Sequence, residues 1–166
     1  MSGSTHSEVS MIDARSFTRQ NIGAILRRVH SEGSGLGPLL LCFLSGEDAD
    51  ACTEPMLRDP APPIGTPFGD DFPDELMSAL TANSAVHDGA ILFRRSAVTA
   101  PYLIEGWSQR LMAPSPANHL GKPNRGSAYN SCLATSGQAG VDSVVLLTRG
   151  CVYIFENGTE KDTFDV

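Results

Sequence analysis

This sequence lacks the features that mark membrane, secreted or nucleic-acid-binding proteins. No apolar run approaches the roughly 20 residues that cross a bilayer. The polar start, Met1 to Ser10, has no apolar core of the kind found in signal peptides. The 19 acidic and 12 basic residues give a formal net charge of −7, whereas general nucleic-acid binding needs a basic face. We therefore expect no membrane and no nucleic-acid partner, with a cytoplasmic location as the default.

Cysteine is scarce, and its spacing excludes a zinc site built from neighbouring thiols. None of the four cysteines lies two to four residues from another. Nothing in the sequence indicates the oxidising compartment in which disulfides form. Three of the cysteines lie in or beside apolar runs, where we expect them to pack as small hydrophobic side chains. The four residues are Cys42, Cys52, Cys132 and Cys151.

The length and the order of the patterns predict one α/β domain with a mixed central sheet flanked by helices. At 166 residues the chain can bury about two thirds of its extended surface. We expect a flexible lead-in over 1–14, the domain over 15–158 and an acidic tail over 159–166. Apolar spacing predicts helices from Ser16 to about Val29, after Asp71 and over 124–136. Strands are predicted at 39–44, 90–93, 144–148 and 151–155, the last two as a hairpin.

Two stretches resist assignment. Residues 47–71 contain five prolines and form either a surface excursion or a functional flap. Residues 97–116 include Tyr102, Trp107, Leu111 and Met112, which we expect to fill the core rather than to wall a pocket. The acidic cluster at 70–75 is better explained by its place at a helix start than by metal binding.

Charge is unevenly distributed along the chain. The segment from Asp88 to Gly150 contains six basic and three acidic residues, a net charge of +3. The rest of the chain has a net charge of −10. An acidic protein that concentrates positive charge in one segment can bind a small anion there. The alternative is that these arginines are solvated surface residues.

Two stretches place an ionisable side chain where regular structure changes type. His87-Asp88-Gly89-Ala90 leads from a helical segment into a strand, and Leu120-Gly121-Lys122-Pro123-Asn124-Arg125-Gly126-Ser127 leads into a helix. A carboxylate at such a turn can hold Mg²⁺ or Mn²⁺, which bridges phosphate oxygens. An arginine at a helix start adds a planar, positively charged guanidinium to backbone N–H groups that already favour anions. Our hypothesis is that Asp88 and Arg125 face one pocket for a nucleotide phosphate.

The combination resembles the diadenylate cyclase (DisA-type) domain family over residues 71–158. The similar features are the Asp-Gly-Ala element at Asp88, the Leu-Gly-x-x-x-Arg element ending at Arg125, Val141-Asp142-Ser143 before a strand, and Asn157-Gly158. The resemblance implies an α/β sandwich that binds one ATP per subunit. It also implies face-to-face pairing of two subunits, in which each 3′-hydroxyl attacks the opposite α-phosphate to make cyclic di-AMP.

The resemblance assigns Asp88 to the divalent metal and to activation of the hydroxyl, and Arg125 to the last position of a phosphate-binding Arg-His-Arg triplet. This sequence departs from that family at several positions. Pro123 and Asn124 stand where the triplet has its first arginine and its histidine. Thr148 matches a Ser/Thr, but Arg149 and Gly150 replace the acidic pair that follows it. In reactions that depend on charge neutralisation, losing such groups lowers the rate by orders of magnitude.

Three hypotheses for function follow. We favour a sensor-type domain that binds ATP, a related nucleotide or a cyclic dinucleotide, with weak or no catalysis. The alternatives are an active cyclase with a modified phosphate clamp, in which Asp88 is catalytic, and a protein-interaction domain with a vestigial pocket. A cyclase requires a homodimer or higher homo-oligomer, whereas a sensor can bind as a monomer. The candidate ligand-binding residues are Asp88, Gly89, Ala90, Gly121, Lys122, Asn124, Arg125, Gly126, Ser127, Thr148 and Arg149, with Asp88 also the candidate ligand of Mg²⁺ or Mn²⁺.

Overall fold

A computed structural model describes residues 19–33, 36–45, 52–114 and 125–166. The expected lead-in over 1–14 lies outside the described residues, as do Gly121, Lys122, Pro123 and Asn124. The elements in chain order are α1 (Arg19–Glu32), β1 (Leu39–Ser45), β2 (Thr53–Pro55), α2 (Phe72–Ala82), the 3₁₀ helix η2 (Ser84–His87), β3 (Ala90–Arg95), β4 (Leu103–Leu111), α3 (Ser127–Thr135), β5 (Val141–Leu147), β6 (Cys151–Glu156) and β7 (Thr159–Asp165).

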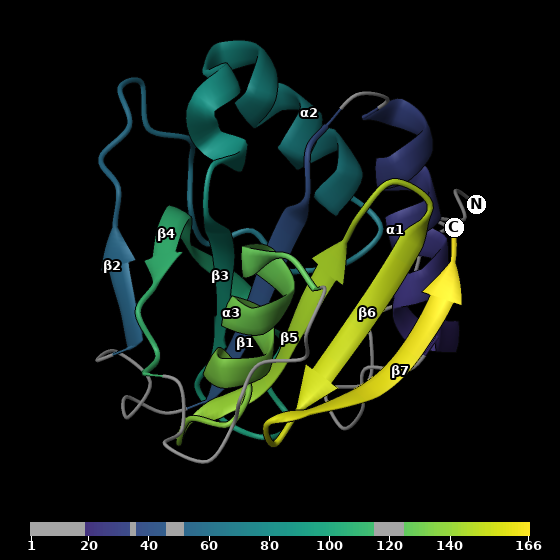
Figure 1. Ribbon diagram of the computed structural model, residues 1–166. Helices are drawn as coiled ribbons and strands as arrows, with labels where there is room; N and C mark the ends of the chain where they lie inside the picture. Colours follow the sequence, from purple (N-terminus) through teal and green to yellow (C-terminus); the bar gives the residue numbers. More distant parts are fainter. Residues whose placement is uncertain (1–18, 34–35, 46–51, 115–124) are drawn as a thin grey trace, which may run out of the picture.

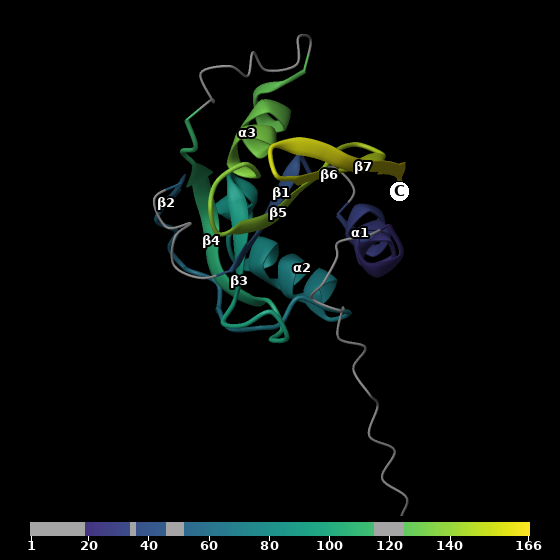
Figure 2. The same cartoon turned by 90° about the horizontal axis from the view of Figure 1, so that it is seen from below.

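The strands form one seven-stranded sheet in the order β2-β4-β3-β1-β5-β6-β7 (Figure 1). β1 and β3 are parallel, and the other neighbouring pairs are antiparallel. Helices α1 and α2 cover one face of the sheet, and α3 covers the other (Figure 2). The prediction of a mixed central sheet flanked by helices is therefore confirmed.

The apolar run at 39–44 forms β1, whose two faces both contact the core. Leu41 and Phe43 pack on the side of α1 and α2, whereas Leu40, Cys42 and Leu44 pack on the side of α3. Side chains alternate between the faces of a strand, so a strand covered on both sides needs an unbroken apolar sequence. The prediction of a strand at 39–44 is confirmed, and its unbroken apolar sequence is explained by its coverage on both faces.

Helices α1 and α2, both predicted from apolar spacing, each bury a stripe of apolar side chains. Ile22, Ile25, Leu26 and Val29 of α1 are buried. In α2 the buried residues are Phe72, Pro73, Leu76 and Ala79, whereas Met77 and Leu80 are only partly buried. The acidic start of α2 contributes an ion pair, because Asp74 Oδ1 accepts from Arg28 Nη2 of α1 at 2.6 Å.

Phe43 is the centre of an aromatic cluster between the sheet and α2. Its ring stacks on Phe93 at 4.9 Å between centroids and meets the edges of Phe68 and Tyr102 at 5.0 and 5.2 Å. Tyr102 and Trp107 are both buried in this core, as we expected, but Met112 is 51% exposed. Of the four residues that we expected to fill the core, the two aromatic ones do so, Leu111 is partly buried against the core on the side of α3, and the expectation is wrong for Met112.

Three strands were not predicted. β4 lies within 97–116, where register shifts against β3 and the positive φ of 52° at Ser108 break the alternation of side chains. β2 lies within 47–71 and is only three residues long. The expected acidic tail is instead β7, paired with β6 along its length. As an edge strand, β7 has a single apolar residue, the buried Phe164, so its sequence looks polar.

Asp142 organises polar contacts at the edge of the sheet where β1 ends. Its carboxylate accepts from Ser45 Oγ at 2.8 Å, from Tyr102 Oη at 2.5 Å and from Arg95 Nη2 at 2.9 Å. Burial and the hydrogen bond to Asp142 raise the pKa of Tyr102 above its ordinary value. The Val141-Asp142-Ser143 element therefore has a structural role that joins β1, β3, β5 and the residue just before β4.

Two of the three cysteines in or beside apolar runs, Cys42 and Cys132, are buried as predicted, whereas the third, Cys151, is only partly buried. Cys42, Cys52 and Cys132 are buried free thiols, and Cys151 is a half-buried one. Burial raises the pKa of Cys42 and of Cys132, so these thiols stay protonated in the folded protein. Within the described ranges, no helix combines the length and the apolar character needed to span a bilayer.

Replacing Phe43 tests the importance of the aromatic cluster. We expect Phe43→Leu to lower the free energy of unfolding by about 1–3 kcal/mol, because it leaves a cavity among three rings. Leu57→Ala is the control, since that side chain is 92% exposed and its loss should change stability by less than about 0.5 kcal/mol. Urea denaturation measures both, and equal losses would contradict this account of the core.

Candidate functional site

The ends of three strands meet at one edge of the sheet. β1 pairs in parallel with β3 through Leu40 and Ala90, and antiparallel with β5 through Leu39 and Leu147. As a result β1 and β3 begin where β5 ends, at the upper edge of the sheet in Figure 1. The segments just outside these strands carry Pro38, Asp88 and Thr148, so this edge collects residues from distant parts of the sequence.

A pocket of about 530 Å³ opens at this edge, between the start of α3 and the β5–β6 turn. Its walls combine aliphatic and aromatic side chains with backbone from the glycine-bearing segments that lead into β1 and α3. Its lining residues are Gly37, Pro38, Arg125, Gly126, Ala128, Tyr129, Leu146, Thr148, Arg149 and Tyr153.

The charged residues that line this pocket are both arginines. Arg125 comes immediately before α3, and Arg149 lies in the β5–β6 turn. Gly150 makes that turn with a φ of 87°, and Thr148 closes it by donating from its N–H and its hydroxyl to the carbonyl oxygen of Cys151. None of the described residues that line the pocket is acidic, so its charge favours an anion.

Two tyrosines fix the position of the Arg125 guanidinium. The guanidinium carbon lies 4.9 Å from the centroid of the Tyr129 ring and 5.5 Å from that of Tyr153, within the range of cation–π attraction. Arg125 Nη1 also donates to Tyr153 Oη at 3.4 Å. Tyr129 is buried, and its hydroxyl donates to the Glu160 carboxylate of β7. A contact with β7 therefore holds one wall of the pocket.

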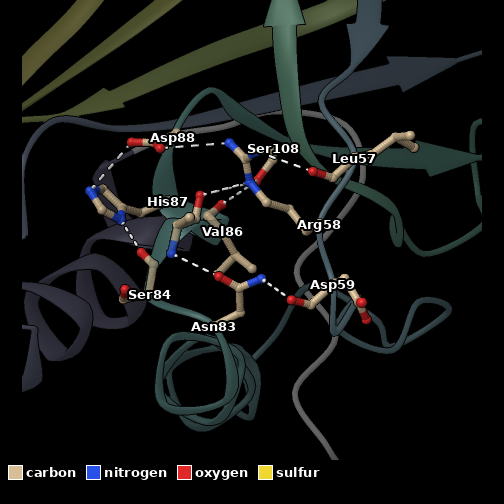
Figure 3. A network of polar contacts seen from close by, with 10 residues as sticks. Leu57, Arg58, Asp59, Asn83, Ser84, Val86, His87, Asp88 and Ser108 are labelled. Carbon is tan, nitrogen blue, oxygen red and sulfur yellow. Dashed lines mark hydrogen bonds and ion pairs between the residues drawn. The ribbon is translucent and has the colours of Figure 1, made fainter.

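Asp88 lies two residues before β3 and contacts two basic side chains (Figure 3). Its Oδ2 is 3.6 Å from Arg58 Nη2, and its Oδ1 is 3.7 Å from His87 Nε2. The Asp88 side chain is 60% exposed, whereas that of Arg58 is 19% exposed. Asp88 thus presents an accessible carboxylate with a more deeply placed cation beside it.

Hydrogen bonds to groups other than Asp88 hold Arg58 in place. Its Nε donates to the carbonyl oxygen of Ala85 at 3.0 Å and to Ser108 Oγ at 3.1 Å. Its Nη1 donates to the carbonyl oxygen of Leu57 at 3.2 Å. Ser108 is fully buried, and its hydroxyl donates in turn to the carbonyl oxygen of Val86 at 3.0 Å.

The structure brings together part of the candidate set. Arg125, Gly126, Thr148 and Arg149 line one pocket, whereas the exposed Ser127 does not. Asp88 lies at the same edge of the sheet but does not line the pocket. The hypothesis of one pocket faced by both Asp88 and Arg125 must be corrected in this respect, because the Asp88 carboxylate is directed to Arg58 and His87.

Gly89 and Ala90 have packing roles at this edge. A Cβ on Gly89 would lie 2.6 Å from the carbonyl oxygen of Gln109 and 2.6 Å from Met56 Cε, and its φ is 84°. Glycine is therefore needed for the approach of β4, a constraint that exists without a ligand. Ala90 is fully buried on the side of α3.

Sequence reasoning missed the two tyrosines and Arg58. Tyr153 lies in the recognised strand at 151–155, and Tyr129 lies one position from Ala128 in the recognised helix. The sequence pattern placed both tyrosines in predicted elements. It could not show that their side chains meet, because that contact depends on how α3 packs against β6. Arg58 had no such signal, because it lies in the unassigned proline-bearing stretch at 47–71.

The residues around Asp88 do not fit a divalent metal site. A hard cation prefers several oxygen ligands, whereas Asp88 has a guanidinium and an imidazole within 4 Å. Within 19–33, 36–45, 52–114 and 125–166 there is also no group of three or more His, Cys, Asp or Glu residues arranged to hold a metal ion.

Comparison with solved structures identifies the fold. A protein from Bacillus cereus, described as a hypothetical membrane spanning protein, aligns over 87% of this chain with a TM-score of 0.58 and 14% identity. This chain covers 64% of that protein, or less than two thirds of its length. DacA from Staphylococcus aureus, a diadenylate cyclase solved as a double mutant, aligns over 84% of this chain and 83% of its own, with a TM-score of 0.52 and 14% identity. No protein-family model matches the sequence, and no curated protein matches it.

The Arg58–Asp88 contact can be probed without unfolding the protein. We expect Asp88→Asn to change the free energy of unfolding by less than about 1 kcal/mol, because exposed ion pairs contribute little. Arg58→Gln should cost about 1–3 kcal/mol, because it removes the donor to Ser108 and to the Ala85 carbonyl group. Urea denaturation distinguishes the two, and a larger loss for Asp88→Asn would refute this order.

Proposed function

We propose that this domain is a sensor-type nucleotide-binding domain with a diadenylate-cyclase-like fold. Its ligand is ATP, a related nucleotide or a cyclic dinucleotide, bound with weak or no catalysis. The observation that carries this proposal is the pocket at the strand ends, where both charged lining residues are arginines and the neighbouring side chains are tyrosines.

The chemistry of the pocket supports an anion with a flat apolar part. A guanidinium makes paired hydrogen bonds to phosphate oxygens, and Arg125 stands at the start of α3, where N–H groups point outwards. The ring of Tyr153, with Leu146 and Ala128, offers an apolar surface on which a base can stack. The volume of about 530 Å³ lies within the range of small-molecule sites, about 300–1,000 Å³.

The residues that differ from the cyclase pattern support binding without efficient chemistry. Pro123 and Asn124 bring no positive charge to the loop before Arg125. Arg149 and Gly150 stand where the family has an acidic pair. Arg149 lines the pocket, where it strengthens binding of a ground-state anion, and such uniform binding does not accelerate a reaction.

An active cyclase is the second candidate, favoured by the exposure of one side chain. Asp88 lies at the same edge as the pocket, and its carboxylate is 60% exposed. A substrate that extends from the pocket along the edge could therefore reach it. The interaction-domain hypothesis remains for the case in which no nucleotide binds.

A ligand panel tests nucleotide binding directly. We expect ATP or cyclic di-AMP to raise the melting temperature, because a ligand at 100 times its Kd adds about 2.7 kcal/mol of stability. Arg125→Gln should weaken binding about tenfold or more, because a charge-assisted phosphate contact is lost. Thermal-shift titration measures both effects.

Arg110→Gln is the matched control for this panel. Arg110 is another exposed arginine, paired with Glu54 at 2.9 Å, and it does not line the pocket. Its substitution should leave the ligand response unchanged. If no nucleotide stabilises the protein, and Arg125→Gln behaves as Arg110→Gln does, the interaction-domain hypothesis gains support and nucleotide binding is refuted.

Product analysis separates the sensor from the cyclase. Purified protein incubated with ATP and Mn²⁺ should yield no cyclic dinucleotide by mass spectrometry, because the phosphate clamp lacks its cationic and acidic partners. An active diadenylate cyclase assayed in parallel controls for the conditions. Formation of cyclic di-AMP that is lost in Asp88→Asn would establish the cyclase alternative.

A further inference from the structure

We infer that Arg58 occupies the position beside Asp88 that a divalent cation would otherwise take, so that phosphates bind at this edge without a metal ion. The ligand in this inference rests on the proposed function. The Arg58–Asp88 arrangement does not, and it can be tested in the absence of any nucleotide.

The guanidinium of Arg58 is positioned before any ligand arrives. Its Nε and Nη1 groups donate to Ala85, Ser108 and Leu57, and its side chain is only 19% exposed. The chain around Arg58 is attached to the neighbouring 3₁₀ helix, because Asn83 Nδ2 donates to the carbonyl oxygens of Asp59 and Pro60 at 3.3 Å each. Figure 3 shows the Arg58 guanidinium beside Asp88, with Ser108 and Leu57 close to it. The cation is therefore a fixed part of the fold.

Its position conflicts with a metal ion at Asp88. Arg58 Nη2 lies 3.6 Å from Oδ2 and His87 Nε2 lies 3.7 Å from Oδ1, so each carboxylate oxygen has a basic group beside it. A divalent cation bound to either oxygen would approach the permanent positive charge of Arg58. The charge that a metal would supply to phosphate oxygens is already present.

The pair lies along the edge that carries the pocket. Leu40 of β1 is paired with Ala90 of β3, so Pro38 and Asp88 each lie two residues before this pair, and Pro38 lines the pocket. Neighbouring strands are about 4.8 Å apart. Arg125 and Arg149 line the pocket beyond β1, and Arg58 lies on the side of β3. A phosphate chain laid along this edge would meet guanidinium groups on both sides of β1.

The first test measures Mn²⁺ binding by the protein alone, from the loss of the electron paramagnetic resonance signal of free Mn²⁺. Wild-type protein and Asp88→Asn should bind Mn²⁺ equally weakly. Arg58→Gln should gain roughly tenfold in affinity, because it removes a like charge beside the metal, and the double substitution with Asp88→Asn should lose that gain. Arg58→Lys keeps the positive charge at this position, and this variant should exclude Mn²⁺ as the wild type does. Arg110→Gln controls for a general loss of positive charge.

Two results of this titration would overturn the inference. One is Mn²⁺ binding by the wild type that Asp88→Asn abolishes, since Asp88 would then be an ordinary metal ligand. The other is an unchanged Mn²⁺ affinity in Arg58→Gln, with folding verified by circular dichroism, since Arg58 would then not exclude the metal.

The second test measures ATP affinity by isothermal titration calorimetry, in EDTA and in excess Mg²⁺. Wild-type affinity should agree within about twofold between the two conditions, whereas Arg58→Gln should bind about tenfold more weakly in EDTA and recover in Mg²⁺. A wild-type loss of more than about tenfold in EDTA would refute metal-independent binding. Absence of ATP binding in both conditions would refute ATP as the ligand of the proposed function, and the Mn²⁺ titration would still decide the role of Arg58.

Discussion

The arrangement of this domain depends on the two different pairings of β1. It is the central strand, parallel to β3 on one side and antiparallel to β5 on the other, and its side chains are buried against helices on both faces. Parallel pairing brings the beginnings of β1 and β3 together, and antiparallel pairing adds the end of β5. The edge that results is the one place where residues near 38, 88 and 148 meet, and the pocket lies there.

The electrostatics of that edge contrast with those of the whole chain. The formal net charge is −7, yet the charged residues lining the pocket are Arg125 and Arg149. The carboxylate of Glu160 accepts from the hydroxyl of Tyr129, whose ring lies against Arg125. Tyr129 and Tyr153 keep the Arg125 guanidinium in place through ring faces and a hydroxyl, groups that do not cancel its charge.

Asp88 and Arg125 represent two different ways of presenting charge at one edge. Arg125 is exposed and rests on aromatic rings, whereas the exposed carboxylate of Asp88 is matched by Arg58, a cation that backbone carbonyl groups and Ser108 hold. The fold is similar to that of DacA, and the strand ends of this chain carry the arginine-lined pocket and the Arg58–Asp88 pair. Under the proposed function, these positive groups suit the edge to holding an anion rather than to activating one.

The sequence by itself determined the elements whose apolar patterns are regular. The unbroken run of β1, the stripe of α1, and the β5–β6 hairpin turning at Gly150 follow from local periodicity and turn chemistry. Sequence patterns also identified Arg125, Thr148 and Arg149 as candidates. Only the tertiary structure decided that β7 pairs with β6, that β4 continues through the irregular Ser108, and that Arg58 reaches Asp88. These features depend on contacts between residues far apart in the chain, such as the 50 positions that separate Arg58 from Ser108, and no local pattern records them.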